Sequence, residues 1–514
     1  MLPAFDAFSA PSSAFGATPD DTDATFGAAA GATCGPRIAM IASLAIAALA
    51  AGLLTPAAWA QPSLTVQNGA TFEVQKELDV TGDLSKDGSS TLTFGSGGVL
   101  TLSGSSQQTV ASSVGPISVA DLTLDNSNGA ALNSSVDVTS VLRLTSGQLA
   151  TGGNLTLSST GESASARIAG SGSGTISGDV TVERFIGYEP TDASHWRMMA
   201  SPVGGALDRQ QGGGGGEHDT YSGPPFLSNT WTQGNGVTGA NTQISGAAPS
   251  VFYYDETASV GSDPTAGWTA VPDLTNPTTG GSIESQEGFA VYLFQDRDFD
   301  GSNERFPITL SATGSVSGAE NDGSDVALPV SCTDNDGSGS DGCTDSNDGW
   351  NLVANPFVSH VDWNDDGGSG FTKSELEANA YIYDADAGAY EQTDGTNNGD
   401  PFIAPFQAFF VKSDAASGNE GSVDLQVNSN AKADPANSDD REFKSVDADP
   451  LVSLQLSDGN RVEETRVTFR EDAEAGKDRY DGYQLTPLGA DYHVLASKID
   501  GRGSTYDSQY RPLP

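Results

Sequence analysis

The sequence predicts an all-β protein: an N-terminal β-solenoid-like repeat segment, then two duplicated β-sandwich-like modules and a partial C-terminal β-sandwich. Short runs of alternating apolar and polar residues recur from residue 62 to the end, and Gly, Asn, Asp and Ser separate them. No long segment has the i, i+3, i+4 apolar spacing of a helical bundle. The 62 glycines among 514 residues favour thin cores with many tight turns.

Residues 1–60 are expected to be a leader that ends in a signal peptide. The uncharged apolar run Ile38–Leu54 precedes the sequence TPAAWA, in which Ala58 and Ala60 occupy the positions of an A-x-A cleavage site. A run of about 17 residues is short for a stable membrane span, although an N-terminal anchor is the alternative. We expect cleavage between Ala60 and Gln61, which leaves no membrane span in the mature chain.

Residues 61–165 are expected to form the solenoid-like repeat segment. The sequences GVLTLSG, ADLTLDN and GNLTLSS share an L-T-L core. Period-two alternation places Leu and Val on one face of each strand and Thr on the other. Each unit is too short to bury its own apolar face, so neighbouring units must stack. An ordinary sandwich with repetitive turns is the alternative.

Two related β-modules are predicted over residues 178–315 and 350–435. The sequences HWRMMASPV and GWNLVANPF share W-x-x-x-A-x-P. Downstream, VFYYDE matches AYIYDAD, and QEGFAVYLF then matches PFQAFFVKS. Three landmarks in the same order indicate a duplication. In each copy the Trp begins a buried strand and the Pro ends it, since Pro lacks a ladder donor.

Residues 316–349 are interpreted as an acidic linker that carries a disulfide. Cys332 and Cys343 are the only cysteines after the leader, and two cysteines in an exported chain are expected to be oxidised. A loop this short stabilises the fold by roughly 3 kcal/mol in the chain-entropy model. Residues 446–514 are interpreted as the partial β-sandwich.

The charge of the chain is strongly acidic, with 68 acidic residues against 23 basic ones and a net charge of −45. Concentrated salt tolerates such a surface, because the Debye length falls to about 3 Å at 1 M. The acids are spread over the whole chain, which favours adaptation to high salt over dedicated cation sites. No basic stripe is present to neutralise phosphates, so nucleic acid is excluded as a partner.

Two Asp-rich loops are candidate calcium sites. DRDFDG matches the first six positions of D-x-[DN]-x-[DN]-G but lacks Glu at position twelve, and DNDGSG has an Asp there. The alternative is that both are Asp-Gly turns in an acidic protein. Calcium is the one candidate cofactor, and no other is expected. The candidate ligands are Asp296, Asp298, Asp300, Asp334, Asp336 and Asp345.

The sequence offers no catalytic residue. Only four histidines are present, without an HExxH, GxSxG or Cys–His nucleophile pattern. His360 is interpreted as a structural histidine at the end of a strand. Carboxylate pairs for glycoside hydrolysis cannot be recognised among so many acids. The five tryptophans after the leader are assigned to core packing, with a sugar-stacking platform as the alternative.

The paired motifs resemble a recurrent block in large secreted and surface proteins of Bacteroidetes-type bacteria. The residues that carry the resemblance are SGDVTVERFI before HWRMMASPV, and GWNLVANPF before IYDADAGAY and APFQAFFVK. Proteins of that group are typically exported by the type IX secretion system. A C-terminal sorting domain usually closes their chains, and none is visible after residues 446–514. The acidic loops are typical of a halophilic relative.

The resemblance implies a secreted or cell-surface protein. A non-enzymatic role in adhesion or in a surface layer is the leading hypothesis. The alternative is an extracellular carbohydrate-binding protein or an accessory part of a polysaccharide-degrading enzyme. The expected partners are components of the cell envelope or the extracellular matrix, with glycans as a further candidate.

Overall fold

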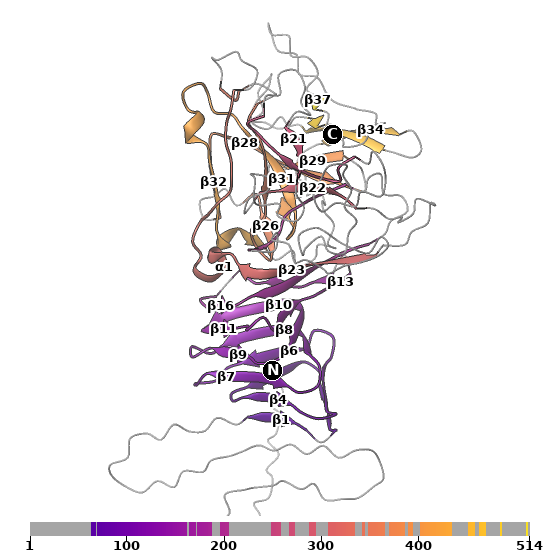
Figure 1. Cartoon of the computed structure of the whole chain (residues 1–514), viewed down its shortest axis with the longest axis vertical. Helices are drawn as coiled ribbons and strands as arrows, with labels where there is room; N and C mark the ends of the chain where they lie inside the picture. Colours follow the sequence, from indigo (N-terminus) through magenta and orange to yellow (C-terminus); the bar gives the residue numbers. More distant parts are fainter. Residues whose placement is uncertain are drawn as a thin grey trace, which may run out of the picture.

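The computed structural model consists of a coil of stacked strands and a head of antiparallel sheets (Figure 1). The all-β prediction is confirmed, because strands make up nearly all of the described regular structure. The structure describes residues 63–67, 69–161, 164–170, 172–187, 196–204, 248–258, 267–272, 287–293, 307–334, 342–344, 348–364, 370–385, 389–393, 401–433, 451–457, 462–468, 484–485 and 510–511.

The coil is a parallel β-solenoid of about five turns, as the L-T-L repeats predict. Two of its faces are sheets in which each strand pairs with the strand one turn later. The first face consists of β1 (Leu64–Val66), β4 (Leu84–Lys86), β7 (Gln108–Ser112), β9 (Ala130–Leu132), β11 (Gln148–Ala150) and β16 (Thr175–Ser177). The second consists of β3 (Glu77–Val80), β6 (Val99–Leu102), β8 (Ile117–Asp125), β10 (Val136–Ser146), β12 (Leu155–Leu157) and β17 (Val180–Ile186). A shorter third face pairs β2 (Thr71–Val74) with β5 (Thr91–Phe94).

Aliphatic side chains fill the interior of the coil in ladders. The register stacks Leu100, Leu122 and Leu142 in successive turns, and all three are fully buried. The neighbouring Thr101 and Thr123 are partly exposed, as period-two alternation requires. Each turn therefore buries its apolar face against the next turn, which a single turn could not do alone.

An antiparallel strand closes the end of the coil that faces the head. β17 continues the parallel ladder past residue 165, the predicted end of the repeat segment. β23 (Ile308–Val316) pairs antiparallel with the whole of β17, and β19 (Val203–Gly204) pairs with the last two residues of β23. Both ends of the predicted module 178–315 thus belong to the sheet of the coil. The physical reason is that the last strand of a parallel ladder has an open edge, which β23 covers.

Two four-stranded antiparallel sheets form the centre of the head. They have the same strand order, in which the first strand in the chain is followed by the fourth, the second and the third. This shared order is what the three repeated sequence landmarks predict. The first sheet consists of β18 (Trp196–Met199), β22 (Phe289–Tyr292), β20 (Val251–Tyr254) and β21 (Trp268–Ala270). The second sheet consists of β25 (Trp350–Ala354), β31 (Ala408–Ser413), β28 (Leu376–Asp384) and β29 (Ala389–Thr393).

An approximate twofold relation connects the two sheets. Two isolated bridges join them, one between Met199 and Gln407 and the other between Glu287 and Val353. Met199 and Val353 are equivalent, because each lies three residues after the Trp of its motif. Glu287 and Gln407 are equivalent in the same way, two residues before the partners of Met199 and Val353. Such reciprocal contacts are the signature of a twofold interface.

Aromatic side chains fill the space between the two sheets. The ring of Phe410 lies 5.0 Å from that of Tyr254 and 5.7 Å from that of Trp268. On the second sheet, the rings of Trp350 and Tyr381 are 5.0 Å apart. The two copies of the motif therefore share one aromatic core instead of forming two separate modules.

The segment predicted as a linker, 316–349, packs into the head. Its strand β24 (Val326–Ala327) pairs with β32 (Asp424–Val427), and Ala319 and Leu328 are buried. The other described elements are α1 (Gly318–Asp322), η2 (Glu420–Ser422), η3 (Ser429–Ala431), β13 (Ser159–Gly161), β14 (Ala164–Ser165), β15 (Arg167–Ile168), β24 (Val326–Ala327), β26 (His360–Asp362), β27 (Phe371–Ser374), β30 (Phe402–Ile403), β32 (Asp424–Val427), β33 (Lys432–Ala433), β34 (Leu451–Ser457), β35 (Val462–Thr468), β36 (Gln484–Leu485) and β37 (Tyr510–Arg511). Among the described residues, no helix has the length and apolar character needed to span a membrane.

Hydrogen bonds join the coil to the head, and one of their donors, Lys432, also forms a buried ion pair within the head. The backbone N–H of Ile168 donates to the carbonyl of Val358 at 2.8 Å. The Lys432 ammonium forms an ion pair with Glu320, and both side chains are buried. Lys432 also donates to the carbonyl of Ala169 at 3.3 Å. The coil and the head are thus joined by directed contacts from both sides.

Candidate functional site: the disulfide loop between the two sheets

The calcium candidates fall mostly outside the described residues. Asp334 is described and partly buried, directly after Thr333. In the described ranges, no three His, Cys, Asp or Glu side chains gather closely enough to hold a metal ion. The calcium sites therefore stay predictions, as does cleavage between Ala60 and Gln61. Outside the described residues lie Asp296, Asp298, Asp300, Asp336, Asp345, Ala60 and Gln61.

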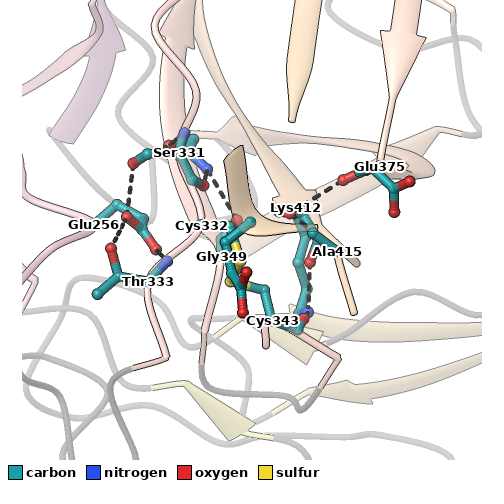
Figure 2. Close-up of a disulfide and its surroundings, with 12 residues drawn as sticks. Glu256, Ser331, Cys332, Thr333, Cys343, Gly349, Glu375, Lys412 and Ala415 are labelled. Carbon is teal, nitrogen blue, oxygen red and sulfur yellow. Dashed lines mark hydrogen bonds between the residues drawn. A yellow bond between two sulfur atoms is a disulfide. The ribbon is translucent and has the colours of Figure 1, made fainter. Parts of the chain in front are cut away.

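The predicted disulfide between Cys332 and Cys343 is present (Figure 2). The two Cα atoms are 5.9 Å apart, and the cysteines are 11 positions apart in the sequence. Cys343 is fully buried. The bond therefore closes a loop whose second cysteine is anchored inside the head.

Hydrogen bonds hold the start of this loop to the first sheet. Glu256, which follows β20, is 8% exposed. Its carboxylate accepts hydrogen bonds from the Ser331 hydroxyl at 2.6 Å, the Thr333 backbone N–H at 2.6 Å and the Thr333 hydroxyl at 2.9 Å (Figure 2). Three donors on one carboxylate compensate the cost of burying its charge.

A second set of hydrogen bonds holds the loop to the second sheet. The backbone N–H of Ser331 donates to Oδ1 of Asn351 at 2.9 Å, and Nδ2 of Asn351 donates back to the Ser331 carbonyl at 2.9 Å. The backbone N–H of Cys343 donates to the carbonyl of Ala415 at 2.8 Å. The disulfide loop thus connects the equivalent sheets of the duplicated head.

A buried lysine contacts the second cysteine of the disulfide. Lys412 of β31 is fully buried, and its Nζ donates to the carbonyls of Cys343 at 2.9 Å and Ser413 at 3.0 Å. A carboxylate oxygen of Glu377 in β28 lies 3.8 Å from the same Nζ. Gly349, with φ of 75°, passes so close that an added Cβ would lie 2.9 Å from Cβ of Cys343. A side chain at position 349 would therefore displace the cysteine.

The sequence reasoning missed Lys412, Glu377 and the neighbouring Asn379. One signal was available: Lys412 is the one basic residue in the apolar strand AFFVKS, where alternation places it on the same face as Phe410. A lysine on the inner face of a central strand needs a buried partner. Sequence alone does not show that Glu377 is that partner.

His360 is the one histidine in the described ranges and begins β26, as expected for a structural histidine at a strand end. Burial, together with the cations of Arg184 and Arg167, lowers the pKa of its imidazole to about 3. The ring is therefore neutral at physiological pH.

The tryptophans mainly pack the core. Trp268, Trp350 and Trp363 are buried, and Trp231 lies outside the described residues. Trp196 is partly exposed. Among the described tryptophans, a sugar could therefore stack on Trp196 alone.

Comparison of the chain with protein-family models, with curated proteins and with solved structures finds no match.

Proposed function

We propose that the chain is a secreted or cell-surface-attached structural protein of the adhesion type, non-enzymatic and adapted to high salt. The observation that carries this proposal is the disulfide loop, which ties together the two sheets of the head at the end of a solenoid coil. Disulfides persist in oxidising, extracellular compartments. In a protein attached to the cell surface, such a coil would hold the cross-linked head, and any binding surface on it, away from the cell.

Sequence features agree with this proposal. The apolar run before Ala60 supports export through a signal peptide, and the paired Trp motifs support a relation to type IX secretion substrates. The net charge of −45 supports adaptation to concentrated salt. Components of the cell envelope or the extracellular matrix are the proposed partners.

The location is tested on the cells that make the protein. Brief protease treatment of intact cells, followed by peptide mass spectrometry, is expected to release peptides of the head. The mature N-terminus is expected at Gln61, and Cys332 and Cys343 are expected to resist thiol labelling until they are reduced. Intact leader peptides in a cytosolic fraction, with both thiols free, would overturn the proposal.

Salt adaptation is tested by thermal unfolding of the purified chain. Removal of salt lengthens the Debye length from about 3 Å at 1 M to about 10 Å at 0.1 M, so repulsion among the acids grows. We expect the Tm to fall as NaCl or KCl decreases over this range. A Tm that rises or stays constant on dilution would contradict adaptation to high salt.

A group of partly exposed aromatic rings favours carbohydrate binding as a second function. Trp196, Phe252 and Tyr292 lie on neighbouring strands of the first sheet, with ring centroids 5.8 Å and 5.4 Å from Trp196. Partly exposed aromatic rings can stack on sugars. A glycan array with the full chain tests this function, with W196A as the variant. Binding that W196A does not weaken would reject these rings as the sugar platform.

A further inference from the structure

Three polar side chains are buried together inside the second sheet of the head. Lys412 of β31 and Asn379 of β28 are fully buried, and Glu377 of β28 is 7% exposed. β28 and β31 are neighbouring strands in the centre of this sheet. Buried Lys, Asn and Glu on adjacent strands need a physical explanation, because each is costly to remove from water.

The strand register brings Asn379 close to Lys412. Leu376 pairs with Ser413 and Ala380 pairs with Val411, so residues 377–379 of β28 face Lys412 alone across an irregular part of the antiparallel ladder. Opposite residues in such a ladder have Cβ atoms about 4.5–5.5 Å apart, and diagonal neighbours are about 7–8 Å apart. A lysine side chain can span either distance.

The amide of Asn379 has no hydrogen-bond partner. Both its Nδ2 and its Oδ1 are buried and unpaired. An unsatisfied buried polar group destabilises the folded state, and an amide contains two such groups. A well-packed sheet does not retain this cost without a reason. One reason is that the amide is a reactant, which is consumed when the protein matures.

The neighbours of Asn379 complete a reactive group. Nζ of Lys412 lies 3.8 Å from a carboxylate oxygen of Glu377. On its other side, Lys412 pairs with Trp350, whose ring lies 5.0 Å from that of Tyr381. The lysine therefore lies between an aromatic ring and one carboxylate, with its ammonium also held by the carbonyls of Cys343 and Ser413.

We infer that Lys412 and Asn379 join through an intramolecular isopeptide bond, with Glu377 as the proton carrier. Glu377 accepts a proton from the Lys412 ammonium, and the neutral amine attacks Cγ of Asn379. Glu377 returns this proton to the amide nitrogen, which leaves as NH₃, and then takes up the extra proton of the newly bonded Nζ. One C–N bond forms, one C–N bond breaks and one NH₃ is released, so no oxidant or reductant is needed.

The first sheet provides an internal comparison. Superposition of the two ladders pairs Tyr292 with Lys412 and Ser250 with Asn379. Tyr and Ser cannot form this bond, so the cross-link is specific to the second sheet. There it covalently links β28 to β31 beside the disulfide, where Lys412 contacts the carbonyl of Cys343. The inference rests on these contacts and not on the proposed function.

The decisive experiment is mass spectrometry of the purified full chain after reduction and alkylation. The wild-type protein is expected to weigh about 17 Da less than its sequence, the mass of one ammonia. Proteolysis is expected to yield a branched peptide that contains Lys412 and Asn379. An N-terminal Gln61 also loses ammonia when it cyclises, so tandem spectra must assign the loss to this pair.

Variants separate the roles of the three residues. K412M and N379L are expected to lack the branched peptide, and E377Q is expected to leave Lys412 and Asn379 unreacted in a folded chain. Y292F, at the equivalent position of the first sheet, is expected to retain the cross-link. The wild-type chain tests the inference by itself, so the result stands even where a variant fails to fold. Separate, unmodified peptides from the folded wild-type protein would overturn the inference.

Discussion

The two sheets of the head share a strand order but differ in size and interior. The strands of the first have three or four residues, whereas β28 of the second has nine and β31 has six. At equivalent positions, Ala290 of the first sheet corresponds to Phe410 of the second, and Tyr292 corresponds to Lys412. Backbone pairing therefore maintains the topology, while the side chains between the sheets have diverged. The second copy contains the aromatic ring of Phe410 and the buried lysine, and its strand β31 anchors the disulfide loop.

Truncation of Phe410 tests the difference between Phe410 of the second sheet and Ala290 of the first. It is expected to destabilise the protein more than any other change described. Phe410 is 2% exposed and its ring contacts those of Tyr254, Trp268 and Trp350. Phe410→Ala makes this position equivalent to Ala290 and leaves a cavity, so we expect a loss of about 3–5 kcal/mol. Urea unfolding of the full chain, followed by tryptophan fluorescence, measures it.

Phe252→Ala is the matched control in the first sheet. Phe252 is a partly buried Phe that packs on the edge of the same core. Its truncation is expected to cost less, about 1–2 kcal/mol, because less apolar surface is lost. Equal losses for the two variants would show that the second sheet does not dominate the core.

Removal of the disulfide tests whether the second copy depends on its cross-link. C332A/C343A opens a loop whose ends are 11 positions apart in the sequence, and is expected to lower the free energy of unfolding by roughly 3 kcal/mol. Chemical denaturation of the oxidised wild type and the double variant measures the difference. The reduced wild type serves as the control and should match the double variant. A variant as stable as the oxidised protein would mean that the hydrogen bonds of Glu256 and Asn351 hold the loop alone.

Substitution of Gly288 tests how closely the two sheets approach each other beside the bridge between Glu287 and Val353. A Cβ at Gly288 would lie 2.4 Å from Cβ of Ala408, which is its equivalent in the second sheet. Gly288→Ala is therefore expected to push the sheets apart and to cost about 1–3 kcal/mol. Thermal unfolding measures this cost. Gly318→Ala is the control, because no atom lies within 4 Å of its added Cβ, and we expect no loss.

Local sequence patterns predicted the repeated parts of the fold well. The L-T-L cores predicted the stacked turns, because inward Leu and outward Thr follow directly from strand geometry. The W-x-x-x-A-x-P motifs predicted equivalent strands in both copies. These features depend on residues that are close together in the sequence.

Features that depend on distant residues were not predictable. Lys412 is held by the carbonyl of Cys343, which is 69 residues away, and no sequence spacing indicates that contact. β23 closes the coil through a ladder with β17, more than a hundred residues earlier. The acidic composition of residues 316–349 suggested a linker, although Ala319 and Leu328 are buried. Composition describes the average exposure of a segment, whereas packing depends on single side chains.

Protonation of His360 tests the edge of the second copy. Of the changes described, it is expected to alter the free energy of unfolding least. His360 begins β26, in a three-stranded sheet that has no counterpart in the described part of the first copy. The folded protein lowers the pKa of His360 from 6.5 to about 3, so below pH 6.5 the unfolded chain binds a proton that the folded chain does not. His360 therefore contributes stability above pH 6.5, and this contribution is lost as the pH falls towards 3.

At pH 5.5 the loss from His360 is about 1.4 kcal/mol relative to neutral pH, which is the free energy of one pH unit. His360→Gln removes the titrating group, so the stability gap between wild type and variant should shift by this amount between pH 7.5 and 5.5. Carboxylates also titrate in acid, but they are the same in both proteins and cancel in the comparison. Arg184→Met is the control: it removes one cation that lowers the pKa, so it should reduce the loss without abolishing it, since burial remains the main cause. A stability difference between wild type and His360→Gln that stays constant with pH would mean that the imidazole of His360 is solvated in the folded protein. The edge of the second copy would then be accessible to water.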